Sequence, residues 1–151
     1  MSCASSCPCP ACTDGHRGRT VVLGEQTQFF AGNLHGRGDD AVAETFDLFV
    51  QAEKLLALAG MTFRDVIRTW IHLRDIDRDY AALNAARRDF FASRGIARRP
   101  ASTGVQGIPF ADGHDFSLGL FAVKAPRPLD VPQMSTPTLN EAWTYGADFS
   151  R

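Results

Sequence analysis

Glu141 lies close to Trp143 and Tyr145 in a stretch that also carries apolar residues. Aromatic surroundings disfavour the charged form of a carboxyl group, so we expect a raised pKa for Glu141. A carboxyl group of that kind can act as a general acid and protonate the carbon of an enol ether or an enamine. Tyr145 could bond a substrate oxygen or pack between subunits. The alternative for Glu141 is an ordinary surface carboxylate on a loosely docked tail.

Three small residues that could bind an anion, Ser102, Thr103 and Gly104, follow a proline. Their hydroxyl groups and backbone N–H groups could hold a carboxylate or a carbonyl oxygen. Arg98 and Arg99 come just before them and could attract the same anion. Both observations have ordinary alternatives, because small polar residues are common where a strand starts and paired arginines are commonly solvated.

A second set of candidates shares one face of a predicted strand, Val66–Leu73. Because side chains alternate along a strand, Arg68, Trp70 and His72 point to the same side. A cation and a ring surface there could hold an unsaturated acid. Packing between subunits explains these residues equally well. His72 as a catalytic base has no recognisable partner in the sequence.

All four cysteines lie near the start of the sequence, at Cys3, Cys7, Cys9 and Cys12. Thiolates this close together could bind zinc or another soft metal. Their spacing, C-x3-C-x-C-x2-C, differs from that of standard zinc fingers, which join two separated pairs. A tail with reduced thiols, a metal site and a disulfide all stay open as interpretations.

The bulk composition limits the class of protein. With 151 residues, of which 44% are hydrophobic and 22% charged, the chain fits one ordinary globular domain. A formal net charge of -1 gives no general attraction to nucleic acid or to an acidic membrane. The sequence has no apolar run of about 20 residues and no signal-peptide pattern. We therefore expect a cytoplasmic protein that binds neither nucleic acid nor a membrane.

The hydrophobic pattern predicts the element order β-β-α-β-α-β-β. The expected strands are Thr20–Leu23, Gln28–Ala31, Val66–Leu73, Ser102–Ile108 and Asp115–Lys124. The first two strands form a hairpin, and Asp112 and Gly113 lie in a turn between the last two. The final strand has one apolar face, made of Phe116, Leu118, Leu120 and Ala122. In the strand Val66–Leu73 the corresponding face is made of Ile67, Thr69, Ile71 and Leu73.

The first predicted helix spans Ala41–Ala59, with a cap at Asp39 or Asp40 and an end at Gly60. Its expected apolar stripe is Val42, Phe46, Phe49, Val50 and Leu56.

The second helix is expected to open at Asp77 or Asp79 and to stop at Gly95. One of its sides carries Tyr80, Leu83, Arg87 and Phe90. Two such helices on one face of a mixed sheet would bury both apolar stripes, which predicts an α+β fold. The other face of the sheet then needs its own cover. Oligomerisation is the simplest solution, and a ring-like trimer is one form of it.

The run from Leu56 to Leu73, LALAGMTFRDVIRTWIHL, resembles the Rid (YjgF-like) superfamily. The resemblance extends over roughly Thr20–Pro126. It includes further residues at the family's spacing: Asp75, Ile76, Asp77, Tyr80, Leu83, Asn84, Phe90 and Phe91. It implies a chorismate-mutase-like fold, homotrimers, and small-molecule sites between subunits.

One segment departs from the deaminase branch of that superfamily. Deaminases typically have Pro-Ala-Arg before the strand that follows the second helix, and that arginine binds the substrate carboxylate. Here Pro100 and Ala101 are followed by Ser102. A nearby arginine such as Arg98 would not automatically offer the same fork to a carboxylate. The departure counts against ordinary enamine deaminase activity.

Two segments, Pro100–Val105 and Asn140–Arg151, are similar instead to the C-terminal domain of chorismatases, as is Arg68-Thr69-Trp70. Chorismatases hydrolyse the enol ether of chorismate, and the resemblance implies that Glu141 is the catalytic acid. It also suggests three parts: a Cys-rich tail over 1–18, a Rid-like domain over 19–126, and an extension over 127–151 that completes the site. The N-terminal domain of chorismatases has no counterpart in this sequence.

The sequence therefore predicts a chorismatase-like hydrolase or lyase that acts on a small unsaturated carboxylate and needs no cofactor. Two alternatives stay open: a generic imine or enamine deaminase, and a non-catalytic trimeric protein that binds a small ligand. Ribonuclease activity is disfavoured because the composition is neutral and lacks a basic stripe.

Overall fold

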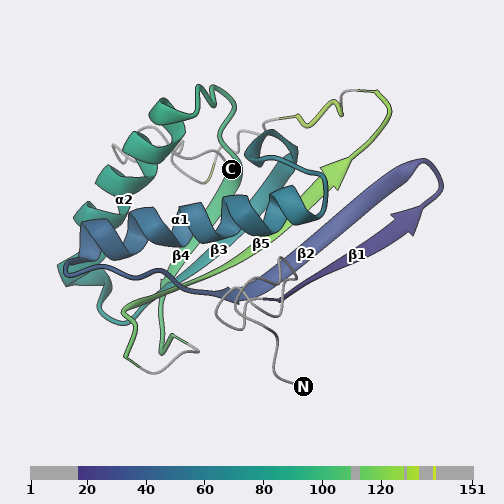
Figure 1. The fold of residues 1–151 in the computed structure, drawn as a ribbon. Helices are drawn as coiled ribbons and strands as arrows, with labels where there is room; N and C mark the ends of the chain where they lie inside the picture. The colour runs from purple at the N-terminus through teal and green to yellow at the C-terminus, as the bar shows by residue number, and fades with distance from the viewer. Residues whose placement is uncertain (1–16, 110–112, 128, 133–137, 139–151) are drawn as a thin grey trace, which may run out of the picture.

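The computed structural model of the chain describes residues 17–109, 113–127, 129–132 and 138. Within these residues two helices lie on one face of a five-stranded sheet with the order β1-β2-β5-β3-β4 (Figure 1). The strands are β1 (Arg17–Leu23), β2 (Gln26–Leu34), β3 (Val66–Leu73), β4 (Ala101–Gln106) and β5 (Phe116–Lys124). The helices are α1 (Ala41–Leu58) and α2 (Ile76–Ser93), and a short 3-10 helix, η2 (Phe63–Asp65), precedes β3. The predicted α+β class and element order are confirmed.

The hairpin of β1 and β2 is confirmed, but both strands are longer than the pattern predicted. Antiparallel pairing extends to Arg17↔Gly32. Gly24 has a φ of 59°, which suits the tight turn between the strands. Gly18 carries no side chain that would indicate a strand, yet its position requires glycine. A Cβ there would lie 2.1 Å from Cζ of Phe29, so the ring occupies the space over the glycine.

α1 begins after Asp40, whose side chain accepts a hydrogen bond from the backbone N–H of Ala43 at 2.8 Å. Gly60, with a φ of 68°, follows the end of the helix. The predicted apolar stripe is partly wrong, since Val42 is 43% exposed. The residues of α1 that are buried are Thr45, Leu48, Phe49, Gln51, Ala52, Leu55 and Leu56. This arc is wider than a single stripe because both the sheet and α2 pack against α1.

β3 starts with an irregularity, since its register with β5 shifts between Val66 and Arg68. Val66 is buried and Ile67 only partly so, contrary to the simple alternation that put Ile67 in the core. Beyond the irregularity the prediction is confirmed. The buried side chains are Thr69, Ile71 and Leu73, and the exposed ones are Arg68, Trp70 and His72.

α2 starts at Ile76, so the prediction of Asp77 or Asp79 as its cap is wrong. The cap is Asp75, whose side chain accepts a hydrogen bond from the backbone N–H of Arg78 at 3.0 Å. Asp79 is only 3% exposed and accepts hydrogen bonds from the Arg78 guanidinium at 2.7 and 2.6 Å. This interaction with Asp79 is the largest cause of a raised pKa for Arg78. The predicted inner side of the helix is confirmed, with Leu83, Arg87 and Phe90 buried and Tyr80 half-buried.

β4 lies at the edge of the sheet, where it pairs in parallel with β3. β5 pairs antiparallel with both β2 and β3, so β3 separates β4 from β5. The two last strands are therefore not hairpin neighbours, although Gly113, with a φ of 81°, lies between them as predicted. The predicted bounds of β4 also extend too far, because the strand ends at Gln106.

The core lies between the sheet and the helices. Four phenylalanines meet there, with ring centroids between 5.1 and 6.1 Å apart: Phe49, Phe63, Phe90 and Phe91. The opposite face of the sheet has no helix over it within the described residues (Figure 1). Phe30 and Phe121 stack on each other at 4.7 Å, and Phe30 is 44% exposed. None of the described helices is both long and apolar enough to cross a membrane.

Candidate functional site

The candidate residues Ser102, Thr103 and Gly104 occupy the edge strand β4, and the strand separates them. The parallel register pairs Thr103 with Trp70, which points to the open face. Ser102 pairs with Thr69, whose side chain is buried on the helix side. Successive side chains of a strand point to opposite faces. The three residues therefore belong to two different surfaces, with Ser102 and Gly104 on the side of α2.

On the helix side, the hydroxyl group of Ser102 forms two hydrogen bonds. Its oxygen lies 3.0 Å from Thr69 Oγ1, which also lies 3.5 Å from the backbone carbonyl oxygen of Ala101, and it accepts a bond from Nη1 of the Arg87 guanidinium at 3.2 Å. Arg87 comes from α2 and is only 3% exposed. Its Nη2 donates to the side-chain oxygen of Asn84, one turn earlier on the same helix. A buried cation is thus held directly behind Ser102.

The bond from Arg87 fixes the role of the Ser102 oxygen. Arginine has only donors, so Ser102 Oγ must act as the acceptor toward Arg87. Ser102 keeps its own hydroxyl proton, which Thr69 Oγ1 or a ligand oxygen can accept. A hydroxyl group next to a positive charge is a stronger donor than an isolated one. Ser102 therefore suits an oxygen atom that carries negative charge.

A cavity lies between α2 and β4, beside Gly104 and two residues along the strand from Ser102. Ile76, Tyr80, Asn84 and Arg87 recur at helical spacing along α2. Ile76, Asp77, Tyr80 and Gly104 line a cavity of about 410 Å³. A Cβ on Gly104 would lie 3.7 Å from Leu73 and 3.9 Å from Tyr80. Glycine therefore leaves this space open. We name the surface formed by Ile76, Asp77, Tyr80 and Gly104 together with Ser102 the α2/β4 groove.

The open face of the sheet holds the other candidates. Arg68 donates through Nη2 to the hydroxyl oxygen of Thr103 at 2.8 Å. Its guanidinium also lies 5.4 Å from the ring centroid of Trp70, a cation–π contact. His72 is exposed on the same strand face. Arg68, Trp70 and Thr103 do come together, but on the surface opposite Ser102.

Arg98 lies in a third place. Its Nη2 donates to the backbone carbonyls of Arg64 at 3.1 Å and Val66 at 3.2 Å. It lines a cavity that contains none of the three β4 candidates. Its neighbour Arg99 stacks over Phe91 at 5.1 Å. The two arginines that sequence proximity linked to Ser102 therefore lie outside the α2/β4 groove.

The remaining candidates lie outside the described residues: Glu141, Tyr145, Cys3, Cys7, Cys9 and Cys12. In the described ranges, no group of three or more His, Cys, Asp or Glu side chains could hold a metal ion.

Arg87 contacts the candidate Ser102 but is not among the site residues predicted from the sequence. The helical pattern predicts only that Arg87 lies on the inner side of the second helix. The signal was present, because a charged residue between the apolar positions Leu83 and Phe90 must find polar partners. Finding Ser102 as that partner required the parallel pairing of β3 and β4, which the sequence pattern did not provide.

Solved structures of known proteins share this fold. A member of the highly conserved YjgF/YER057c/UK114 family from Mycobacterium tuberculosis is 30% identical, covering 69% of this chain and 83% of its own, with a TM-score of 0.56. A YjgF-family protein from Neisseria meningitidis is 24% identical, covering 74% of this chain and 98% of its own, with a TM-score of 0.59. TdcF with bound serine from E. coli is 20% identical, covering 70% of this chain and 86% of its own, with a TM-score of 0.58. No protein-family model and no curated protein matches the chain.

The Mycobacterium tuberculosis protein is 30% identical to this chain, and the match covers 83% of its length, which is enough to show the family. The other two proteins are less than 25% identical and show the fold alone. The two helices packed on a mixed five-stranded sheet match the fold of that family. The chain belongs to the YjgF/YER057c/UK114 family, the Rid superfamily.

Proposed function

We propose that this protein is a small-molecule enzyme that binds an unsaturated carboxylate in the α2/β4 groove and hydrolyses it with acid assistance. The observation that carries the proposal is the Ser102 hydroxyl group, which accepts a hydrogen bond from the buried Arg87 and lies 3.0 Å from Thr69 Oγ1. Its own proton can be donated to a ligand oxygen.

The groove has the character of a small-ligand site. Its cavity of about 410 Å³ falls in the range usual for small molecules. Apolar and aromatic groups from Ile76 and Tyr80 lie at one end, and the Ser102–Arg87 pair lies further along α2 and β4. An unsaturated acid needs the same combination, an apolar wall and an anion-binding end. TdcF was solved with bound serine, a small molecule that carries a carboxylate, which supports a ligand of this class.

The reaction follows from the proposed acid, Glu141. Glu141 transfers a proton to the enol carbon, and the neighbouring ether carbon becomes electrophilic. Water adds to that carbon and returns a proton to Glu141. The ether C–O bond then breaks, and a keto acid and an alcohol are released. Chorismate and related enol ethers are the substrate class that the motif Pro100–Val105 and the segment Asn140–Arg151 favour.

The test is a mass-spectrometric screen of the protein with chorismate and simpler enol ethers. We expect a product heavier than the substrate by one water, or its two fragments. Glu141→Gln should lose at least about 100-fold in turnover, the usual contribution of a general acid. Glu25→Gln, in the exposed turn after β1, is the matched control and should keep full turnover. Full turnover by Glu141→Gln would refute the mechanism.

A second candidate function, imine or enamine deamination, is favoured by Arg87. Ser102 stands where deaminases carry their carboxylate-binding arginine, and the Arg87 guanidinium contacts Ser102 from α2. A guanidinium group supplied by α2 could bind the substrate carboxylate in place of that arginine. Incubation with a source of 2-aminoacrylate separates the two functions, since deamination releases ammonia. Tight binding of unsaturated acids without turnover of either substrate would instead indicate a non-catalytic binding protein.

We also propose that the open sheet face is covered by other copies of the chain in a homotrimer. Phe30 is 44% and Trp70 39% exposed on this face, next to the Arg68–Thr103 pair. Exposed aromatic rings flanked by arginine are typical of subunit interfaces. Trp70→Glu should therefore convert the trimer to monomer in analytical ultracentrifugation. Wild-type protein that sediments as a monomer would refute this proposal.

A further inference from the structure

Three arginines surround a cavity at the end of the sheet where β3 and β4 begin and β5 ends. The cavity measures about 320 Å³, and its charged lining residues are Arg64, Arg98, Arg127 and Asp65. Ile67, Val123, Ala125 and Leu129 supply the apolar part of the wall. The α2/β4 groove shares none of these residues.

The single carboxylate in this lining is already engaged. Asp65 accepts hydrogen bonds from the backbone N–H of Thr62 at 2.8 Å and from its hydroxyl group at 3.2 Å, as part of the η2 cap. Within the described ranges, neither Arg64, Arg98 nor Arg127 forms an ion pair with a carboxylate. Three guanidinium groups against one carboxylate leave the wall with a surplus of two positive charges.

Two of the guanidinium groups are held in place by the backbone. Arg64 donates through Nη2 to the carbonyl of Gly95 at 3.2 Å, and Arg98 donates through Nη2 to the carbonyls of Arg64 and Val66. These bonds use only Nη2, and a guanidinium group carries five N–H donors in all. The Nε and Nη1 donors of both arginines stay available for a ligand, on side chains that are already oriented.

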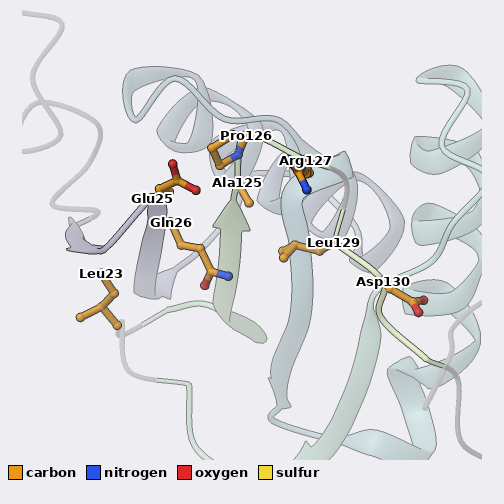
Figure 2. Close-up of a pocket in the computed structure, with 8 residues that line it drawn as sticks. All are labelled: Leu23, Glu25, Gln26, Ala125, Pro126, Arg127, Leu129 and Asp130. Carbon is orange, nitrogen blue, oxygen red and sulfur yellow. The ribbon is translucent and has the colours of Figure 1, made fainter.

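Arg127 completes the ring from the segment that follows β5. Figure 2 shows Arg127 and Leu129 along this segment as it leaves the end of β5, with Glu25 and Gln26 on the neighbouring turn. The same segment also borders a second cavity of about 520 Å³, whose charged residues are Glu25, Arg127 and Asp130. The two cavities thus differ in charge, and Arg127 lines both. The basic cavity is the one suited to an anion.

We propose that the basic cavity binds a small molecule with a dianionic phosphate group. Guanidinium forks match the geometry of phosphate oxygens. A phosphate monoester carries close to two negative charges at neutral pH, which equals the surplus on the wall. The apolar residues Ile67, Val123 and Leu129 would contact the rest of the molecule. This site is independent of the function proposed for the α2/β4 groove.

The test uses inorganic phosphate as the probe, with the full chain and at constant ionic strength. NMR titration with phosphate should give saturable shifts at the amides of Arg64 and Arg98, with acetate giving weaker ones. Arg127→Glu should weaken phosphate binding at least tenfold. Arg88→Glu makes the same charge change at an exposed arginine paired with Asp89, and it should keep the wild-type affinity.

Three results would overturn the proposal. The first is a lack of saturation with phosphate, and the second is an equal loss in Arg127→Glu and Arg88→Glu, which would indicate only general charge attraction. The third is undiminished phosphate binding by Arg127→Glu. Arg98→Lys serves as a second variant, since it keeps the charge and loses the fork. It should fold like the wild type and bind phosphate several-fold more weakly.

Discussion

The two sides of β4 hold their polar groups in different ways. On the helix side, Ser102 contacts Arg87, a buried cation fixed by its bond to Asn84. On the open side, Thr103 contacts Arg68, an exposed arginine that also lies over Trp70. The first arrangement is shielded from water and the second is not. Electrostatic interactions are stronger where water is excluded, so recognition of a carboxylate is expected on the helix side.

The two sides of β4 also divide one short motif between them. Residues 102, 103 and 104 are consecutive, yet the pleat sends Ser102 and Gly104 to the groove and Thr103 to the opposite face. A motif of three small residues can therefore serve a ligand on one side and a subunit contact on the other. Single substitutions at Ser102, Thr103 and Gly104 need not have similar effects.

The largest effect is expected for Arg87→Ala. The change leaves Ser102 and Asn84 without their cationic partner inside the protein, and we expect a loss of about 3 kcal/mol in the free energy of unfolding. Urea denaturation followed by circular dichroism measures it. Arg88→Ala removes the next arginine, which is exposed, and should cost less than about 0.5 kcal/mol. Equal costs for the two variants would show that the buried network contributes nothing special.

A smaller effect, on binding rather than on stability, is expected for Gly104→Val. A Cβ at this position makes ordinary contacts with Leu73 and Tyr80, so the fold should be retained. The two methyl groups of valine would narrow the groove and weaken the binding of a carboxylate ligand about tenfold, or roughly 1.4 kcal/mol. Calorimetric titration gives the affinity. Gly32→Val, with open space around its Cβ, is the control and should bind like the wild type.

The smallest effect is expected for Thr103→Val. This substitution keeps the shape of the side chain and removes the acceptor for Arg68 on the exposed face. Its cost in unfolding free energy should be below about 0.5 kcal/mol, and turnover should be unchanged within about twofold. A large fall in turnover with an unchanged oligomeric state would move the catalytic site to the open face.

Much of the fold could be predicted from local pattern. The cap at Asp40, the end of α1 before Gly60 and the alternation of β3 beyond Thr69 depend on residues close in sequence. The error at α2 was local, since Asp75 caps the helix through the backbone N–H of Arg78, three residues later. The error at the start of β3 occurred where a distant partner decides the outcome, because the register shift against β5 turns Val66 inward.

The candidate site was predictable only in part, for the same reason. The sequence pointed to Ser102 and to the face that carries Arg68 and Trp70. It could not indicate that Arg87 contacts Ser102, because that contact depends on α2 packing beside an edge strand that pairs in parallel. Proximity in sequence was misleading for Arg98, which extends toward Arg64 and Val66 instead.

A crystal structure of Glu141→Gln grown with chorismate tests the central claim most directly. The proposal predicts a ligand in the α2/β4 groove, with a carboxylate oxygen within about 3 Å of Ser102 Oγ. It also predicts that the enol carbon lies within reach of residue 141. A ligand bound beside Trp70 and Arg68 on the open face, or one that leaves Ser102 without contact, would contradict the account.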